Sequence, residues 1–400
     1  MEEDWNGCLY CVITLNWHYK EQYVDITIPN YVPNQLLTYG RPPPKRAQYT
    51  PFEPRPINYG AKYDTIIHEY PGKLLGDSDK KYIQQVLGSF LYYARAIDMK
   101  ILLALNDIAT QQAKPTESTT KRVHQLLDYM AMHPKAIIRF HASFMILNIH
   151  SDASYCSAGR GRSQASGYFF LGSIPVNRQP IKLNGNIHIT CDILKLVADY
   201  AAEAELGTLF INARESKLLR ITLHKLGHPK PPTPFHVENT SAVGIVNNTI
   251  KRQRSRATEM RYFWLLDQYC QKYLDIYHQP GQENLGNYPT KNHTGTVTQH
   301  VRPYYIHEST SPTLLPRAMM PSAWRGCAEI LGDTYHRQVP LPRITNNQSQ
   351  ESTCDPAHPC VQTFGTSVQM KRFQRKPEQS FVQLQRRTDL IKRYTNIRTQ

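Results

Sequence analysis

Long apolar runs are missing from this sequence of 400 residues. The longest, residues 136–149, contains Arg139 and His141, so it is too short and too polar to cross a bilayer. Residues 1–7 are acidic and polar and lack the basic start and apolar stretch of a secretory signal. We therefore expect an intracellular protein, cytoplasmic or nuclear, that is not secreted and has no membrane partner.

Cysteine is scarce as well, with eight residues scattered along the chain. In the absence of a secretory signal, this usage indicates free thiols in a reducing compartment. Cys8 and Cys11 form a CxxC, but no further pair of ligands lies nearby at the spacing of a zinc site. A packed strand is the simpler interpretation of that stretch.

Acidic residues are outnumbered, because 32 Asp and Glu stand against 47 Lys and Arg. The formal net charge is +15 and the isoelectric point is near 9.4. Such an excess favours nucleic acid as the partner, although it does not choose among DNA, RNA and their hybrid.

One basic cluster precedes an aromatic run and consists of Lys251, Arg252, Arg254, Arg256 and Arg261. Basic side chains attract phosphates and aromatic rings stack on bases, so the cluster predicts a rim that binds nucleic acid. The alternative is a solvated helix start whose aromatic residues face the core. For Phe263 and Trp264 we favour that alternative.

Residues 145–278 alternate between strand-like and helix-like patterns. Strands are predicted at 145–155, 166–172, 187–194, from 235, and at 274–278. Alanine and glutamate favour a helix from about residue 198 to 210, and a second helix is predicted at 216–226. Two more helices precede the last strand. The predicted order is βββαβαβα, and the chain of 400 residues is long enough for two or three domains.

Four side chains in this region are candidates for a common site. Asp152 ends the first strand, and Glu205 borders the apolar face of the first helix. Glu203 points about 200° away from Glu205 by helical geometry, so we expect one of the two to meet Asp152. Glu238 follows the fourth strand, and Asn287 follows the fifth.

Each candidate also has an ordinary structural explanation. Asp152 and Asn287 are common turn residues, and Glu205 fits the surface of a helix. Glu238 with Asn239 fits the N-cap region of the helix that follows.

Five motifs occur in order along the chain: Ser151-Asp-Ala-Ser154, Ala201-Ala-Glu-Ala-Glu-Leu206, His236-Val-Glu-Asn-Thr-Ser-Ala-Val-Gly244, Arg261-Tyr262 and Asn287-Tyr-Pro-Thr-Lys291. Together they resemble the ribonuclease H domain of copia-type retrotransposon polyproteins over roughly residues 140–295. The resemblance implies an α/β fold, a ribonuclease H-like mixed five-stranded sheet flanked by helices. The implied reaction is cleavage of the RNA strand of an RNA/DNA hybrid.

By the same resemblance, the catalytic positions are Asp152, Glu205, Glu238 and Asn287. The implied cofactor is Mg²⁺, as a pair of ions about 4 Å apart, with Asp152, Glu205 and Glu238 as ligands. The family has Asp at the last two catalytic positions.

Both departures weaken the expected chemistry. Glu238 adds a methylene that moves the carboxylate by roughly 1 to 1.5 Å, and a misplacement of that size costs on the order of a hundredfold in rate. Asn287 offers a neutral carbonyl oxygen where an anion should help to hold a cation. We therefore expect a ribonuclease H activity that is weak or absent.

The flanks give the remaining domain predictions. Residues 1–32 suggest a β-hairpin, 33–75 a Pro-rich linker, 76–135 a helical region, and 136–295 the ribonuclease H-like domain. The first three resemble the thumb and connection end of a retroelement reverse transcriptase. The polymerase motif Tyr-x-Asp-Asp does not occur in the sequence. We expect a fragment of a polyprotein or a truncated relic.

Residues 296–400 are predicted to be a basic, largely disordered extension. Between residues 371 and 400, nine Lys or Arg stand against two acidic residues. A solvated tail and a phosphate-binding tail both fit this pattern. For the whole chain, the leading hypothesis is a retroelement-derived ribonuclease H-like protein that binds hybrid. The alternatives are a non-catalytic scaffold for protein partners and a decaying reading frame.

Overall fold

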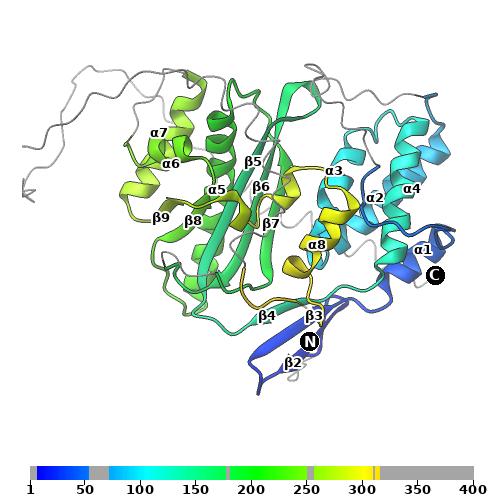
Figure 1. Ribbon diagram of the computed structural model, residues 1–400, viewed down its shortest axis with the longest axis horizontal. Coiled ribbons are helices and arrows are strands. Elements are labelled where there is room, and N and C mark those ends of the chain that lie inside the picture. Colours follow the sequence, from blue (N-terminus) through cyan, green and yellow to red (C-terminus); the bar gives the residue numbers. More distant parts are fainter. Residues whose placement is uncertain (1–6, 54–71, 177–180, 250–255, 310, 316–400) are drawn as a thin grey trace, which may run out of the picture. The chain divides into compact units, whose positions relative to one another are not determined.

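The computed structural model describes residues 7–53, 72–176, 181–249, 256–309 and 311–315 (Figure 1). They belong to one compact unit, Met1–Tyr335. A second unit, His336–Gln400, lies outside the described residues, and with it the predicted basic tail. No helix among the described residues has the length and apolar character needed to cross a membrane.

A five-stranded mixed sheet forms the centre of the unit. Its strands are, in spatial order, β7 (Asn186–Ile193), β6 (Arg162–Gly172), β5 (Ile146–Ala158), β8 (Thr233–Val237) and β9 (Leu274–His278). β5, β6 and β7 pair antiparallel, whereas β5 with β8 and β8 with β9 pair parallel. The predicted α/β fold with a mixed five-stranded sheet is confirmed.

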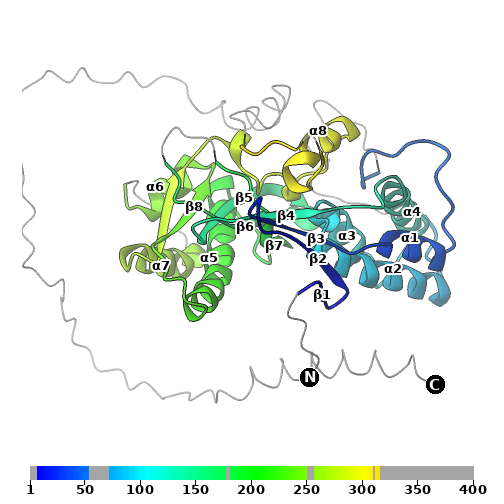
Figure 2. The same cartoon turned by 90° about the horizontal axis from the view of Figure 1, so that it is seen from below.

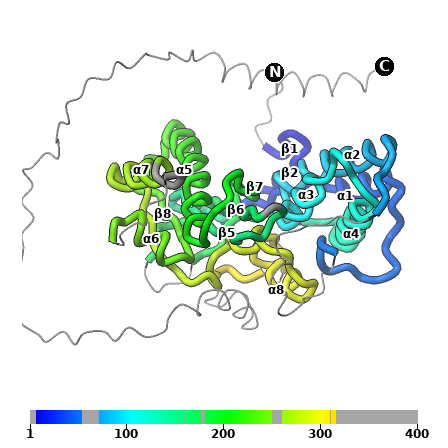
Figure 3. Tube along the Cα trace, turned by 90° about the horizontal axis from the view of Figure 1, so that it is seen from above, coloured from blue at the N-terminus to red at the C-terminus, as the bar shows by residue number. Residues whose placement is uncertain are grey.

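Side chains on neighbouring positions of a strand point to opposite faces of the sheet. Phe169 of β6 therefore packs with Ile149 and Phe235 on one face, while Tyr168 and Phe170 belong to the core on the other face. Three helices cover the first face: α5 (Ala201–Lys225), α6 (Thr240–Val246) and α7 (Arg256–Cys270). Figures 1 and 3 show these helices on the same side of the sheet.

Helix α5 runs without interruption through the two helices predicted from the sequence, so that prediction was wrong. Asn212 lies between the two predicted helical segments. Its side chain is buried and donates to Ser151 Oγ and to the Ser166 carbonyl oxygen, both at 2.9 Å, and its amide oxygen accepts from Thr190 Oγ1 at 2.7 Å. Because these strand partners satisfy the amide, the helix can carry it through the core.

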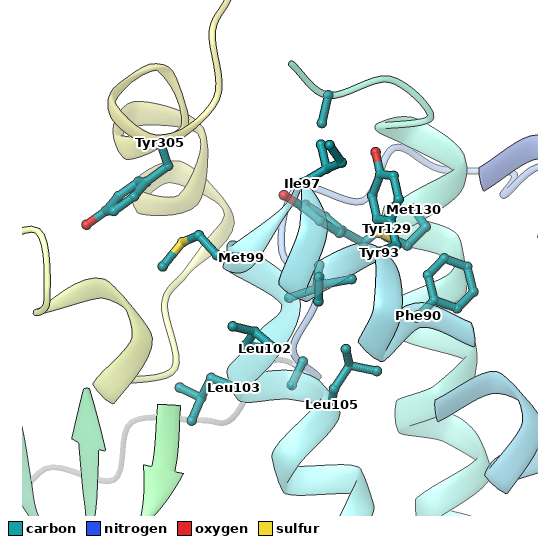
Figure 4. Close-up of a cluster of buried hydrophobic side chains, with 14 of the residues drawn as sticks. Phe90, Tyr93, Ile97, Met99, Leu102, Leu103, Leu105, Tyr129, Met130 and Tyr305 are labelled. Atoms are coloured by element: carbon teal, nitrogen blue, oxygen red, sulfur yellow. The ribbon is translucent and has the colours of Figure 1, made fainter. Parts of the chain in front are cut away.

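The second face and the edge of the sheet adjoin a helical block of α2 (Asp77–Ala96), α3 (Leu102–Ala109) and α4 (Glu117–Met132). Figure 4 shows its buried side chains, among them Phe90, Tyr93 and Tyr129, and Met99 on the side of the block that faces Tyr305. Arg95 and Asn106 donate to the carbonyl oxygens of Ile189 and Cys191 on the edge strand β7. The block thereby closes an edge that would otherwise offer free carbonyl groups to another chain.

The hairpin predicted in residues 1–32 forms, as β2 and β3, within a smaller antiparallel sheet. Its strands, in spatial order, are β1 (Leu9–Tyr10), β2 (Ile13–His18), β3 (Tyr23–Thr27) and β4 (Ile138–His141), and the last three lie side by side in Figure 2. Positive φ at Cys11 and Val12 separates β1 from β2. Arg139 of β4 forms a two-pronged ion pair with Asp25 of β3, at 2.7 and 2.8 Å. β4 thus pairs with an N-terminal strand, although its residues fall in the range predicted for the ribonuclease H-like domain.

Two further helices lie in ranges predicted to be a linker and a disordered extension: α1 (Tyr31–Thr38) and α8 (Gly295–Tyr305). Both contribute to the core, through Val32 and Leu36 of α1 and through Val301 and Tyr305 of α8. Each of these short helices contains a proline, Pro33 in α1 and Pro303 in α8. The described residues also form four single turns of 3-10 helix: η1 (Met99–Ile101), η2 (Gly159–Gly161), η3 (Gly281–Glu283) and η4 (Tyr288–Thr290).

Buried charges join α8 to the helical block. Asp98 and Lys100 are both 0% exposed, and the Lys100 ammonium lies 2.9 Å from Asp98 Oδ1. The ammonium also donates to the hydroxyl of Tyr129 at 3.3 Å. Arg302 of α8 places Nη1 3.6 Å from Asp98 Oδ2 and donates through Nε to Glu308 at 2.6 Å. Two cations thus share one deeply buried carboxylate.

Replacing Asp98 with alanine tests this buried network. We expect the free energy of unfolding to fall by about 3–5 kcal/mol, because Lys100 and Arg302 would lose the buried carboxylate that they share. Urea denaturation followed by circular dichroism measures the loss. The matched control is Asp128→Ala, which breaks the partly exposed pair with Arg41 and should cost about 1 kcal/mol or less. Equal losses in the two variants would contradict the assignment.

Candidate functional site

The parallel pairing of β5 with β8 brings two carboxylates together. His150 pairs with His236 and Ser151 with Val237, so the next residues along the two strands are Asp152 and Glu238. Neighbouring strands lie about 4.8 Å apart, and side chains two positions apart share a face. Asp152 and Glu238 therefore lie side by side, on the face that carries the two histidines.

The two histidines are neutral and supply no positive charge to the carboxylates. Their rings are 4.5 Å apart at the centroids and are buried. Burial lowers the pKa of His236 to about 4 and lowers that of His150 well below its usual value. The backbone N–H of Leu285 donates to His150 Nδ1 at 3.0 Å, which fixes this nitrogen as an acceptor.

Residues 281–291 fold back over the ends of these strands. Asn284 Nδ2 donates to the Ser151 carbonyl oxygen at 2.9 Å, and Thr290 Oγ1 donates to Asp152 Oδ2 at 2.7 Å. Tyr305 of α8 donates to the Leu285 carbonyl oxygen at 2.8 Å and holds the segment from the other side. These contacts hold the end of the segment, at Thr290, against the carboxylate of Asp152.

Asn287 is buried at this place, next to η4, and its amide is occupied at both ends. Lys291 Nζ donates to Asn287 Oδ1 at 2.9 Å, and Asn287 Nδ2 donates to the Gly281 carbonyl oxygen at 3.4 Å. The Asn287 oxygen, which the motif resemblance assigns to the site, therefore accepts a hydrogen bond from a lysine of the same chain.

Glu205 reaches the site from α5 and is buried, with Oε2 lacking a hydrogen-bond partner. Burial raises the pKa of this carboxyl well above its usual value, and the charges of Asp152 and Glu238 add to the rise. Glu203 is turned elsewhere, since its Oε2 accepts from the Asp199 N–H at 2.8 Å before the start of α5. Of the two glutamates, Glu205 is the one on whose pKa the charge of Asp152 acts.

Glu238 packs against Gly281 of η3. A Cβ at position 281 would clash with both oxygens of the Glu238 carboxylate, so glycine leaves the room that the longer side chain occupies. Burial and the charge of Asp152 raise the pKa of Glu238, while the Lys291 ammonium opposes the rise. Burial likewise raises the pKa of Asp152, and Lys291 and the Thr290 hydroxyl lower it.

The residues present do not fit the pair of Mg²⁺ ions that the motif resemblance implies. Mg²⁺ requires several oxygen donors in near-octahedral geometry, and a pair of ions needs carboxylates that bridge them. Within the described residues, no group of three or more Asp, Glu, His or Cys side chains is arranged to hold a metal ion. The Asn287 oxygen accepts from Lys291, and Asp152 Oδ2 accepts from Thr290.

The predicted nucleic-acid-binding residues lie before and within α7 in the sequence. Lys251, Arg252 and Arg254 lie outside the described residues, and Arg256 is the first residue of α7. Arg261 is half-buried on α7. The aromatic residues that follow Arg261 differ in exposure. Phe263 is 51% exposed, so its predicted core position was wrong. Trp264 packs against Phe210 of α5 with ring centroids 5.2 Å apart, as expected.

Comparison with known proteins gives structural matches alone. LC11 ribonuclease H1, isolated from compost, matches with a TM-score of 0.28 and 10% identity, over 36% of this chain and 92% of its own. Ribonuclease H1 from Halobacterium salinarum matches with a TM-score of 0.23 and 14% identity, over 34% and 85%. The N-terminal ribonuclease H domain of a Mycobacterium tuberculosis protein gives 0.22 and 10%, over 34% and 85%. No protein-family model matches the sequence, and no curated protein does.

Three residues of the site escaped the sequence analysis, which assigned no role to Gly281, Thr290 or Lys291. Thr290 and Lys291 stand in the motif that begins at Asn287, so their presence was visible. Their contacts depend on the turn η4, which carries Lys291 back over Asn287, and no spacing rule used for strands or regular helices indicates such a turn.

Alanine substitutions at two glycines test how the segment is seated. A Cβ at Gly286 would lie 2.7 Å from the His150 carbonyl oxygen, which is backbone and cannot move aside. We expect Gly286→Ala to lower the free energy of unfolding by about 1–3 kcal/mol. Gly281→Ala should cost less, because the Glu238 side chain can rotate away, and Gly88→Ala, which meets open space, is the control. Urea denaturation ranks the three, and a larger loss at Gly281 than at Gly286 would refute the arrangement.

Proposed function

We propose that this protein is a ribonuclease H-like, retroelement-derived protein that binds RNA/DNA hybrid and cleaves it weakly or not at all. What supports the proposal is the order of the motifs around Asp152, Glu205, Glu238 and Asn287 along the chain, together with the mixed five-stranded sheet. Their motifs, their order along the chain and the sheet that presents them all agree with the resemblance to copia-type ribonuclease H domains.

The impairment follows from the two altered positions. In phosphodiester hydrolysis by a pair of metal ions, carboxylates must hold both ions in register with the attacking and leaving oxygens. Glu238 places its carboxylate one methylene further from the strand, over Gly281. Asn287 brings no charge, and its oxygen accepts from Lys291. Binding of hybrid depends on the basic surface instead and does not require these carboxylates.

The wider assignment is also a proposal. The helical block and the small sheet correspond by resemblance to the thumb and connection end of a reverse transcriptase. The free thiols of all five cysteines in the described part, Cys8, Cys11, Cys156, Cys191 and Cys270, favour an intracellular site, cytoplasmic or nuclear.

A second candidate function is a non-catalytic scaffold for protein partners. It is favoured by exposed apolar side chains on the small sheet and its turns, where Leu9, Tyr10 and Tyr19 are 63%, 71% and 77% exposed. A pull-down distinguishes the two functions. Protein partners that are recovered equally after nuclease treatment support the scaffold, and partners that are lost support nucleic-acid binding.

Hybrid binding should be strongly salt-dependent. We expect the logarithm of the association constant to fall linearly with the logarithm of salt concentration, because bound lysines and arginines release counterions from phosphates. Replacing Lys251, Arg252 and Arg254 together with alanine should reduce the slope by up to about 3. The control replaces three exposed lysines elsewhere, Lys81, Lys121 and Lys195. Gel-shift titrations provide the measurement, and equal slopes for the two triple variants would rule out the predicted rim.

Restoring the two acids should restore cleavage. We expect little or no hydrolysis of an RNA/DNA hybrid by the chain as it stands, and magnesium-dependent hydrolysis by the variant Glu238→Asp with Asn287→Asp. Each single change should recover less than the pair, because the ligands act as a unit. A labelled hybrid and a denaturing gel measure the product.

The control adds Asp152→Asn to the double variant and should abolish the activity gained. Robust cleavage by the unaltered chain would refute the impairment. A folded, hybrid-binding double variant that stays inert would refute the assignment of the four positions.

A further inference from the structure

Strand β1 closes one edge of the small sheet, beside β2 (Figure 2). It pairs with β2 over two residues, Leu9 and Tyr10, and the N–H of Leu15 donates to the Cys8 carbonyl oxygen at 2.8 Å. The side chains of Leu9 and Tyr10 are both exposed, so the strand buries little apolar surface. An exposed strand of two residues opens more readily than the buried strands of a core.

The turn that joins β1 to β2 is strained. Its central residues, Cys11 and Val12, have φ values of 50° and 71°, in the left-handed region that a two-residue hairpin turn requires. Such turns favour Asn-Gly or Asp-Gly, because this backbone conformation is unfavourable for a β-branched side chain such as valine. Tyr92 of α2 holds the turn in place by donating to the Cys11 carbonyl oxygen at 2.7 Å. Opening of β1 would release the strain in the turn.

Two cysteines flank this strand. Cys8 precedes β1 and Cys11 follows it, both are exposed, and neither is in a disulfide. A strand rises about 3.3 Å per residue, so the two Cα atoms are on the order of 10 Å apart, whereas a disulfide requires less than about 7 Å. The thiols can therefore meet once the two residues between them leave the extended conformation. The Cys-x-x-Cys spacing is one that thiol–disulfide exchange commonly uses.

We propose that Cys8 and Cys11 form a reversible disulfide by exchange with a low-molecular-weight disulfide such as glutathione disulfide, and that this bond releases β1 from the small sheet. One protein thiolate attacks a sulfur of glutathione disulfide, and one glutathione leaves as its thiolate. The second protein thiolate attacks the protein sulfur of the mixed disulfide and expels the other glutathione. The two protein thiols lose two electrons, glutathione disulfide gains them, and the two protons pass to the two glutathiones.

Release of β1 changes the edge of the small sheet. β2 then presents backbone groups that β1 covers in the reduced chain, among them the N–H of Leu15. An open edge can pair with an added strand, so the disulfide controls whether this edge is available to another strand. This regulation goes beyond the proposed function and does not depend on the carboxylate site or on nucleic acid.

The test equilibrates the full chain with glutathione buffers that contain increasing amounts of glutathione disulfide. The remaining thiols are blocked with N-ethylmaleimide, and the linked peptides are identified by mass spectrometry. We expect a disulfide between Cys8 and Cys11 and, in the oxidised chain, faster hydrogen exchange in the peptide that contains Leu15. The matched control, Cys270→Ser, removes an exposed thiol elsewhere and should leave both results unchanged.

Two variants measure how the turn is coupled to the disulfide, through the ratio of glutathione disulfide to the square of reduced glutathione at half oxidation. Val12→Gly relieves the unfavourable φ and favours the closed strand, so this ratio should rise about tenfold. Tyr92→Phe removes the hydroxyl that holds the Cys11 carbonyl oxygen, so the ratio should fall about threefold.

The proposal is overturned if oxidation gives glutathione adducts alone, or if Cys8 or Cys11 pairs with a different cysteine. A disulfide that forms while exchange at Leu15 stays slow would overturn it as well. So would shifts of the ratio in the same direction for Val12→Gly and Tyr92→Phe, because opening of β1 would then not be the step that the disulfide requires.

Discussion

The parallel pairing of β5 with β8 is the constraint on which the site depends. Its register places Asp152 beside Glu238 on one face of the sheet, below the turn that carries Asn287. Glu205 of α5 adds a third carboxyl group whose Oε2 has no hydrogen-bond partner. Burial raises the pKa of both carboxyl groups on the strands, Asp152 and Glu238. Lys291 donates to Asn287 Oδ1 at 2.9 Å, at the end of the segment that covers these strands.

A second set of buried charges determines where that turn lies. Arg302 on α8 shares Asp98 with Lys100, which fixes α8 to the helical block. Tyr305 on the same helix donates to the carbonyl oxygen of Leu285, inside the segment that closes the site. The helical block therefore contributes to the site through α8, in addition to covering the edge strand β7. A loss of the block would remove support from the residues that hold Lys291.

The sequence predicted the order of strands and helices well, because alternating apolar residues and motif order report on local structure. It also placed Asp152 and Glu205 on the right elements. It could not predict the continuous helix through Asn212, since the amide is satisfied by strands far away in the chain. It could not predict that Arg139 pairs with Asp25, because long-range ion pairs leave no periodic pattern. The domain limits and the catalytic roles remain predictions.

Charge balance links the altered acids to the inferred loss of activity. With Asn287 in place of an acid, the site has one negative charge fewer with which to hold a divalent ion, and the Asn287 side-chain oxygen already accepts from Lys291. The most direct measurement is a crystal structure of the chain soaked in manganese chloride, with anomalous scattering used to locate the ions. The account predicts no manganese between Asp152 and Glu205, and Lys291 Nζ within hydrogen-bond distance of Asn287 Oδ1. Two manganese ions about 4 Å apart, with Lys291 turned away, would contradict it.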